Sequence, residues 1–227
     1  MQTKSIRSIR QAELSRAAFE AVVRYGLRKT TLEKVGDLAG VSQGVVLHHF
    51  KNKSALLEAV FRRLNTVLMA SLVEPYRHAE TPFERLWSII IANFSEAIYN
   101  RRVCQAWVSL AAEIPHSAQC QRVQTVCNAR IHSNLRHELK HFLSHEDANR
   151  SALQLGMLID GIWVRGGLNA SPLTSNAAIA EMEYAIFKFL PTDEDSVAKH
   201  KMARRKIENV AKILMSSKAY KESAALS

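Results

Sequence analysis

A short turn between two helical segments constrains this chain more than any other feature. Gly40 can adopt the left-handed conformation that ends a helix, Val41 can fill the corner, and Ser42 can cap a new helix that runs to about His49. Two helices joined by so few residues form a helix-turn-helix, in which the second helix enters the major groove of DNA. The sequence therefore predicts a DNA-binding head.

The helix before this motif is marked by apolar residues at helical spacing. They line one face: Leu14, Ala18, Ala21, Val22 and Tyr25. Gly26 is predicted to end this helix, and Thr30 with Glu33 has the spacing of a capping box that starts the next one. No segment of the chain alternates as a strand does, so we predict an all-α fold.

Basic residues are concentrated at the start of the chain. Of the formal net charge of +10, +7 falls in residues 1–63, none in residues 64–190 and +3 in residues 191–227. A basic head on a neutral body suggests that the head meets a polyanion. We expect a DNA-binding domain over 1–52, a helical ligand-binding and dimerisation domain over 53–190, and a basic C-terminal extension over 191–227.

The cysteines and the hydropathy pattern give no sign of a metal centre or a membrane. Cys104, Cys120 and Cys127 lack the paired spacing of a zinc or redox motif, so we expect reduced thiols in the core. No apolar stretch is long enough to span a bilayer, and the N-terminus lacks the apolar region of a signal peptide. We expect a cytoplasmic protein without membrane contact, cofactor or metal.

The segment 35–57, VGDLAGVSQGVVLHHFKNKSALL, resembles the signature of TetR-family repressors, and the resemblance extends over about residues 17–57. It implies a homodimer that binds double-stranded operator DNA. It also implies DNA contacts from these residues: Thr31, Ser42, Gln43, Val45, His48, His49 and Lys53. Their chemistry agrees, since a lysine at a helix N-terminus suits a phosphate and a glutamine can read a base edge.

Two residues of this segment depart from the family pattern, which often has tyrosines at their positions. Leu47 cannot donate a hydrogen bond to a phosphate. His49 could replace its tyrosine and would make DNA binding mildly dependent on pH.

Three later segments resemble the BetI branch of the same family, the choline-responsive repressors of glycine betaine synthesis. They are QAWVSL at 105–110, RIHSNLRH at 130–137 and IDGIWVRGGL at 159–168. This resemblance implies a small-molecule effector, with choline or a related quaternary ammonium as the candidate. A TetR-type repressor of an efflux or catabolic operon, with another ligand, remains the alternative.

A quaternary ammonium is recognised by aromatic faces and a nearby carboxylate. The candidate ligand-binding residues are Phe94, Tyr99, Trp107, Glu113, Asp160 and Trp163. Asp160 stands out because its helix is otherwise apolar, and a buried carboxylate needs a partner. That partner could be a ligand cation, although we favour an arginine, Arg165 or Arg136, in a structural ion pair. The tryptophans could equally be ordinary core residues.

Two apolar stripes are candidates for a dimer interface built as a four-helix bundle. One is the segment 153–168, and the other comprises Ile179, Met182, Ile186 and Phe189. Either stripe could instead belong to the core of one subunit. The helix that starts near Lys53 runs on toward Ala70, so it joins head to body and could transmit a ligand-driven movement.

The segment H137-E-L-K-H141 matches the zinc-protease pattern, so a zinc metallohydrolase using His137, Glu138 and His141 is a remote alternative. On a helix, however, the two histidines point away from the apolar face toward solvent, and catalytic zinc needs a third ligand in a shielded cleft. We therefore predict that the chain is not an enzyme.

The extension after Pro191 is predicted to be partly disordered and solvated. Ile207, Val210, Ala211 and Leu214 hint at one amphipathic helix within it. Its basic run, residues 199–206, could touch DNA or an anionic membrane.

Overall fold

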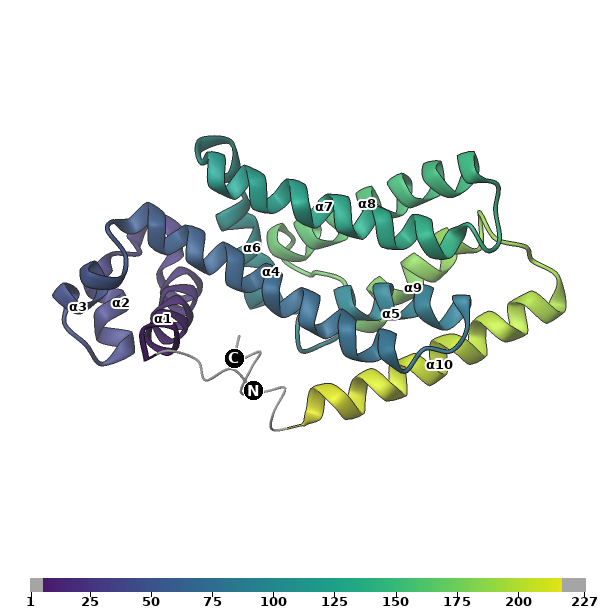
Figure 1. The fold of residues 1–227 in the computed structure, drawn as a ribbon, viewed down its shortest axis with the longest axis horizontal. Coiled ribbons are helices and arrows are strands. Elements are labelled where there is room, and N and C mark those ends of the chain that lie inside the picture. Colours follow the sequence, from purple (N-terminus) through teal and green to yellow (C-terminus); the bar gives the residue numbers. More distant parts are fainter. Residues whose placement is uncertain (1–5, 218–227) are drawn as a thin grey trace.

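The structure is a computed structural model that describes residues 6–217. Across these residues the regular structure is entirely helical, which confirms the predicted all-α class (Figure 1). The elements are α1 (Ile6–Lys29), α2 (Leu32–Ala39), α3 (Gln43–His49), α4 (Lys53–Arg77), α5 (Pro82–Phe94), α6 (Arg101–Ala111), η1 (Ile114–His116), α7 (Ala118–Leu139), α8 (His145–Leu168), α9 (Ser175–Ile186) and α10 (Glu194–Ser216).

Helices α1 to α3 form a head at one end of the molecule, and α4 runs from this head into the body (Figure 1). The apolar face predicted for α1 is buried except at Tyr25, which is 38% exposed. The Lys34 ammonium lies over the Tyr25 ring, 4.6 Å from the ring centroid. The exception follows from Gly26, whose φ of 72° breaks the helix one residue later.

The turn of the head has the predicted conformation, with one correction at the start of α2. The N-cap is Thr31, which accepts a hydrogen bond from Lys34 N at 3.2 Å. Thr30 is buried, and its hydroxyl donates to Gly26 O, so the expected capping box at Thr30 is wrong. Gly40 adopts a φ of 66°, and Ser42 caps α3, both as predicted.

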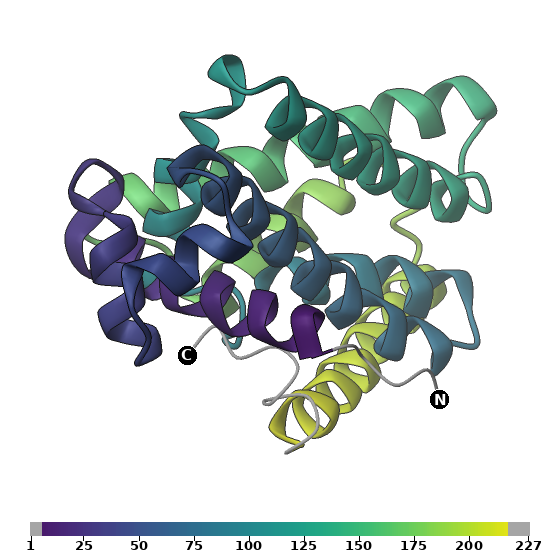
Figure 2. The ribbon, with the colours of Figure 1, turned by 60° about the vertical axis from the view of Figure 1, so that its left-hand side comes forward.

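Helix α5 forms the centre of the body. Every residue from Leu86 to Phe94 is buried, because α4, α7, α9 and α10 all pack around this helix. Helices α7 and α8 lie side by side on one face of the body, and α10 lies on the opposite face (Figure 2).

The extension after Pro191 contains a helix, as the spacing indicated, but the expectation of a solvated and partly disordered extension is wrong for the described residues. Helix α10 packs along α5 and α4. Its buried face comprises His200, Ala203, Ile207, Ala211 and Met215. This long, mostly apolar stripe explains why α10 packs against α5 and α4. The part of the extension from residue 218 onward lies outside the described residues.

Two cations of the basic run in α10 face the body. Arg204 Nη1 lies 2.6 Å from Glu183 Oε2, and Lys206 Nζ lies 2.8 Å from Glu80 Oε2 and 2.9 Å from Glu84 Oε2. Part of the run is therefore used inside the fold and not for an external polyanion.

Candidate DNA-binding surface and effector cavity

The helix-turn-helix presents several of the predicted DNA-contacting side chains to solvent. Thr31, Ser42, Gln43 and His48 are exposed, whereas Val46 anchors α3 in the core of the head. The exposed N-cap hydroxyls and the glutamine can donate to phosphates or reach base edges. This end of the head is the side of the molecule that can enter a major groove.

Lys53 makes an intramolecular contact, and His49 has a shifted pKa, neither of which the sequence revealed. Lys53 Nζ donates a hydrogen bond to Leu27 O at 2.8 Å, which secures the end of α1. The pKa of His49 is lowered, first by burial and then by the positive charges of His48, Arg7 and Arg10. His49 is therefore neutral at neutral pH. Val45 is half-buried.

Arg7 is an exposed basic residue near α3 that no sequence motif pointed to. Its charge is close enough to His49 to lower that pKa, so it lies at the same end of the head. Only the general excess of basic residues in the first part of the chain pointed to it.

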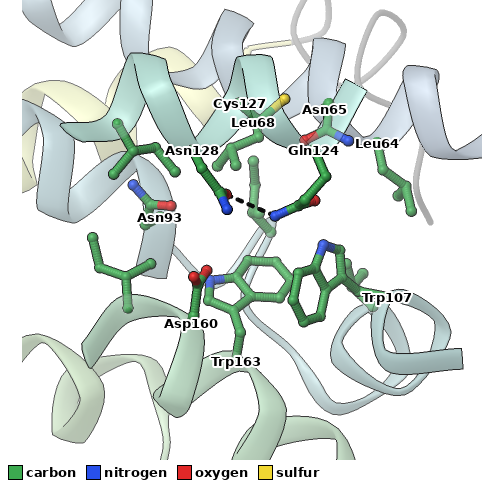
Figure 3. Close-up of a pocket in the computed structure, with 14 residues that line it drawn as sticks. Leu64, Asn65, Leu68, Asn93, Trp107, Gln124, Cys127, Asn128, Asp160 and Trp163 are labelled. Atoms are coloured by element: carbon green, nitrogen blue, oxygen red, sulfur yellow. Dashed lines mark hydrogen bonds between the residues drawn. The ribbon is translucent and has the colours of Figure 1, made fainter. Parts of the chain in front are cut away.

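A cavity of about 40 Å³ lies in the body between α4, α5, α6, α7 and α8 (Figure 3). Its lining residues are Leu64, Asn65, Leu68, Asn93, Ile98, Val103, Trp107, Gln124, Cys127, Asn128, Ile131, Ile159, Asp160 and Trp163. The cavity is therefore mostly apolar, with a few convergent polar groups, as is usual for small-molecule sites.

Three of the six predicted ligand-binding residues line this cavity together: Trp107, Asp160 and Trp163. The two indole rings lie 5.9 Å apart between centroids. Asp160 is half-buried, and burial raises the pKa of its carboxyl group.

The favoured ion pair of Asp160 is absent from the described part of the chain. Neither Arg165 nor Arg136 pairs with Asp160, and no hydrogen bond reaches its carboxylate there. Arg165 is exposed, and it lies five residues further along α8, so it projects from another face of the helix. The carboxylate therefore faces the cavity without a cationic partner from residues 6–217.

Phe94, Tyr99 and Glu113 lie outside the lining of this cavity. Phe94 and Tyr99 support it from behind, because the Phe94 ring packs edge-on against Tyr99 and the Tyr99 ring packs edge-on against Trp163. The Tyr99 hydroxyl donates to Ile162 O at 3.4 Å. Glu113 precedes the short helix η1.

Four carboxamides of the cavity wall were not predicted: Asn65, Asn93, Gln124 and Asn128. Asn93 gave a signal, because it interrupts the apolar run of α5. Gln124 and Asn128 are one helical turn apart, a common spacing on solvent-facing helices, so the sequence did not distinguish them from surface residues.

The apolar stripe of α9 is not a free surface. Ile179, Met182 and Ile186 are buried in the core of the subunit, so the alternative assignment of this stripe, to the core and not to an interface, is the one that the structure supports. The stripe of α8 differs, since Leu153, Met157, Val164 and Leu168 are exposed along one face.

The zinc-protease pattern is divided between solvent and core. His137 and His141 are exposed, as the helical spacing predicted. Glu138 is fully buried and binds the Tyr76 hydroxyl and Arg85 Nε, so its carboxylate is already engaged. Among residues 6–217, no group of three or more acidic, histidine or cysteine side chains is arranged to hold a metal ion.

A helix-turn-helix head joined by one long helix to a body with an internal cavity is the arrangement expected of a ligand-responsive DNA-binding regulator. Comparison with known protein families supports this class of protein. Residues 14–60 match the family described as "Bacterial regulatory proteins, tetR family", and residues 82–191 match "BetI-type transcriptional repressor, C-terminal".

Individual regulators are similar in sequence to this protein over most of its length. The HTH-type transcriptional regulator BetI of Escherichia coli (strain K12) is 33% identical over 193 residues, which cover 83% of this chain and 97% of that protein. The regulator of the same name from Burkholderia ambifaria (strain MC40-6) is 35% identical over 175 residues, covering 77% and 90%.

Solved structures share the fold. A TetR transcription regulator from Haloarcula marismortui ATCC 43049 gives a TM-score of 0.74 at 18% identity, covering 81% of this chain and all of that one. A putative transcriptional regulator from Pseudomonas aeruginosa PAO1 gives 0.69 at 23% identity, covering 82% and 92%.

The chain therefore belongs to the TetR family of transcriptional regulators, and within it to the BetI type. Regulators of this family are not enzymes, which confirms that expectation. No helix in residues 6–217 is long and apolar enough to cross a membrane. The BetI-type match ends at residue 191, just before α10 begins.

Proposed function

We propose that this protein is a homodimeric repressor that releases its operator when choline or a related quaternary ammonium binds, and that it controls genes of glycine betaine synthesis. One observation carries the choice of ligand: the Asp160 carboxylate has no partner within residues 6–217 and shares a cavity with Trp107 and Trp163. A carboxylate and aromatic faces are the groups that attract a quaternary ammonium.

The proposed DNA interface comprises Thr31, Ser42, Gln43, Val45, His48, His49 and Lys53. The exposure of Gln43 and His48 on α3 supports a role in base or phosphate contact. Val45 is apolar and half-buried, so the exposed part of its side chain can make an apolar contact with a thymine methyl group.

The proposed dimer interface centres on the exposed apolar face of α8. Leu153, Met157 and Leu168 are 50%, 62% and 67% exposed in the isolated subunit. A partner that covers this face would remove apolar side chains from water. A dimer also suits the helix-turn-helix, because two recognition helices reach successive half-sites of an operator.

The proposed switch uses α4. This helix begins beside the head at Lys53 and supplies Leu64, Asn65 and Leu68 to the cavity wall. A volume of about 40 Å³ holds roughly three water molecules, which is less than choline needs. A bound ligand must therefore displace the walls, and a displacement of α4 would change the separation of the two heads.

The ligand assignment is tested by titrating choline into the purified protein in a calorimeter. We expect wild type to bind choline and Asp160→Asn to lose at least about tenfold in affinity, because the substitution removes the charge and keeps the shape. Asp37→Asn, at an exposed position of α2, is the matched control and should bind like wild type. Equal choline affinity in Asp160→Asn and wild type would exclude Asp160 from the site.

A further inference from the structure

A groove of about 600 Å³ lies between α4 and α7 and adjoins the effector cavity. Asn65 of α4 and Cys127 of α7 line both spaces. Leu64 lines only the cavity and Thr66 only the groove, and the residues on either side of Cys127 divide between the two spaces in the same way. The cavity and the groove therefore meet at Asn65 and Cys127.

This boundary lies across the cavity from the groups proposed to hold the ammonium. Asp160 and Trp163 project from α8, whereas Asn65 and Cys127 lie on the opposite wall (Figure 3). A ligand whose ammonium group rests beside the Asp160 carboxylate can therefore extend the rest of its chain toward the groove.

The groove carries positive charge. Its lining contains three arginines and, among the described residues, no aspartate or glutamate. Arg62 Nε lies 2.9 Å from Glu58 Oε1, so its charge is partly balanced. Arg122 donates to the neutral Gln119 side chain, and Arg130 has no hydrogen bond or ion pair within residues 6–217. Two guanidinium groups of the groove are thus left without an anion.

Arg130 lies near the boundary between the two spaces. It follows Cys127 by three residues, which is less than one turn of α7. Burial raises the pKa of the Cys127 thiol, and the positive charge of Arg130 opposes this rise. Such an effect weakens with distance, so the guanidinium lies close to the thiol. A guanidinium binds a phosphate through two parallel N–H···O hydrogen bonds.

We infer that the effector site extends from the cavity into this groove and accepts quaternary ammonium ions that carry a phosphate ester, of which choline phosphate is the simplest. This inference rests on the proposed function, because it places the ammonium group beside Asp160. Choline occupies the cavity part of the site alone, and the phosphate adds a contact with Arg130.

The separation of the two charges in the ligand decides whether both parts of the site are used. In choline phosphate, two carbons and an ester oxygen lie between the nitrogen and the phosphorus, so the phosphate can reach beyond the cavity. In glycine betaine a single carbon separates the nitrogen from the carboxylate. That carboxylate would stay near Asp160, and like charges in a half-buried site repel each other.

The boundary must open for the longer ligand. Asn65 belongs to α4 and Cys127 to α7, so the displacement of α4 proposed for the switch would also part these two residues. Occupation of the groove and movement of the head would then depend on the same helix.

The test is calorimetry with the full-length protein at pH 7.5, using choline, choline phosphate and glycine betaine as probes. We expect choline phosphate to bind at least about tenfold more tightly than choline, since a charge-assisted hydrogen bond is worth this much. We expect glycine betaine to bind more weakly than choline, because its carboxylate remains beside Asp160.

Arg130→Gln identifies the residue responsible. We expect this variant to bind choline like wild type and to bind choline phosphate within about threefold of choline, because the cation of the groove is gone. Arg205→Gln is the matched control, since Arg205 is exposed on α10, on the opposite face of the body, and this variant should keep the full preference for choline phosphate.

The outcomes separate this inference from the proposed function. If choline phosphate binds no more tightly than choline, and choline affinity still falls in Asp160→Asn, the inference is overturned and the choline assignment stands. A preference for choline phosphate that persists in Arg130→Gln would also overturn the inference. Failure of both choline and choline phosphate to bind would overturn the inference and the ligand assignment together.

Discussion

Arg85 Nε in α5 lies 2.9 Å from Glu138 Oε2 in α7, and the Glu138 side chain is fully buried. The hydroxyl of Tyr76, near the end of α4, donates to the other oxygen of the same carboxylate. Three helices are thus tied together at the end of α4 that is remote from the head. A movement of α4 would therefore pivot at this end, while the end that carries Lys53 swings.

Arg85→Met should lower the free energy of unfolding by about 3 kcal/mol, because it leaves a buried carboxylate without its cation. The double variant Arg85→Met/Glu138→Leu should recover most of this loss, since no unpaired charge remains. Urea unfolding followed by circular dichroism measures both. Arg77→Met breaks only the exposed pair with Glu74 and should change stability by less than about 0.5 kcal/mol. A loss in Arg85→Met no larger than that in Arg77→Met would show that the buried pair does not stabilise the fold.

His200 should make stability depend on pH. The pKa of His200 is lowered to about 4, chiefly by burial and to a smaller extent by the positive charge of Arg204. The rings of Phe83, Trp87 and Phe187 surround its imidazole, and neither ring nitrogen has a partner within residues 6–217. In the unfolded chain the imidazole takes up its proton near pH 6.5.

The stability contributed by neutral His200 is therefore complete above pH 6.5 and is lost as the pH falls toward 4, by up to about 3 kcal/mol. His200→Phe should remove this part of the pH dependence, whereas His116→Phe, at an exposed position, should keep it. Thermal melts at pH 7.5 and pH 5 measure the difference. Parallel losses in His200→Phe and wild type would contradict the account.

Met157→Lys should weaken dimerisation at least about tenfold, because it would place a charge in the apolar interface proposed on α8. Met202→Lys is the matched control, since Met202 is exposed on α10, away from that face. Sedimentation velocity over a range of protein concentrations measures the proportions of monomer and dimer. A dimer in Met157→Lys as tight as in Met202→Lys would place the interface elsewhere.

The head could be predicted from the sequence because its signals are local: Gly40 and Ser42 act on their own neighbours in the chain. Asp160, Trp107 and Trp163 were identifiable because a carboxylate in an apolar helix and large aromatic residues are unusual side chains. Gln124 and Asn128 were not identifiable, since their position in the cavity wall depends on which helices pack together. The packing of α10 was missed for the same reason, because the sequence does not show that its apolar face packs against α5.

The most direct test of the central claim is fluorescence anisotropy of the DNA upstream of this protein's own gene, at physiological salt, with a scrambled duplex as the control. We predict tight binding to the upstream DNA only, which choline weakens in wild type but not in Asp160→Asn. Equal affinity for the two duplexes would contradict the assignment as a sequence-specific repressor. Release of Asp160→Asn by choline as readily as wild type would contradict the assignment of the effector site.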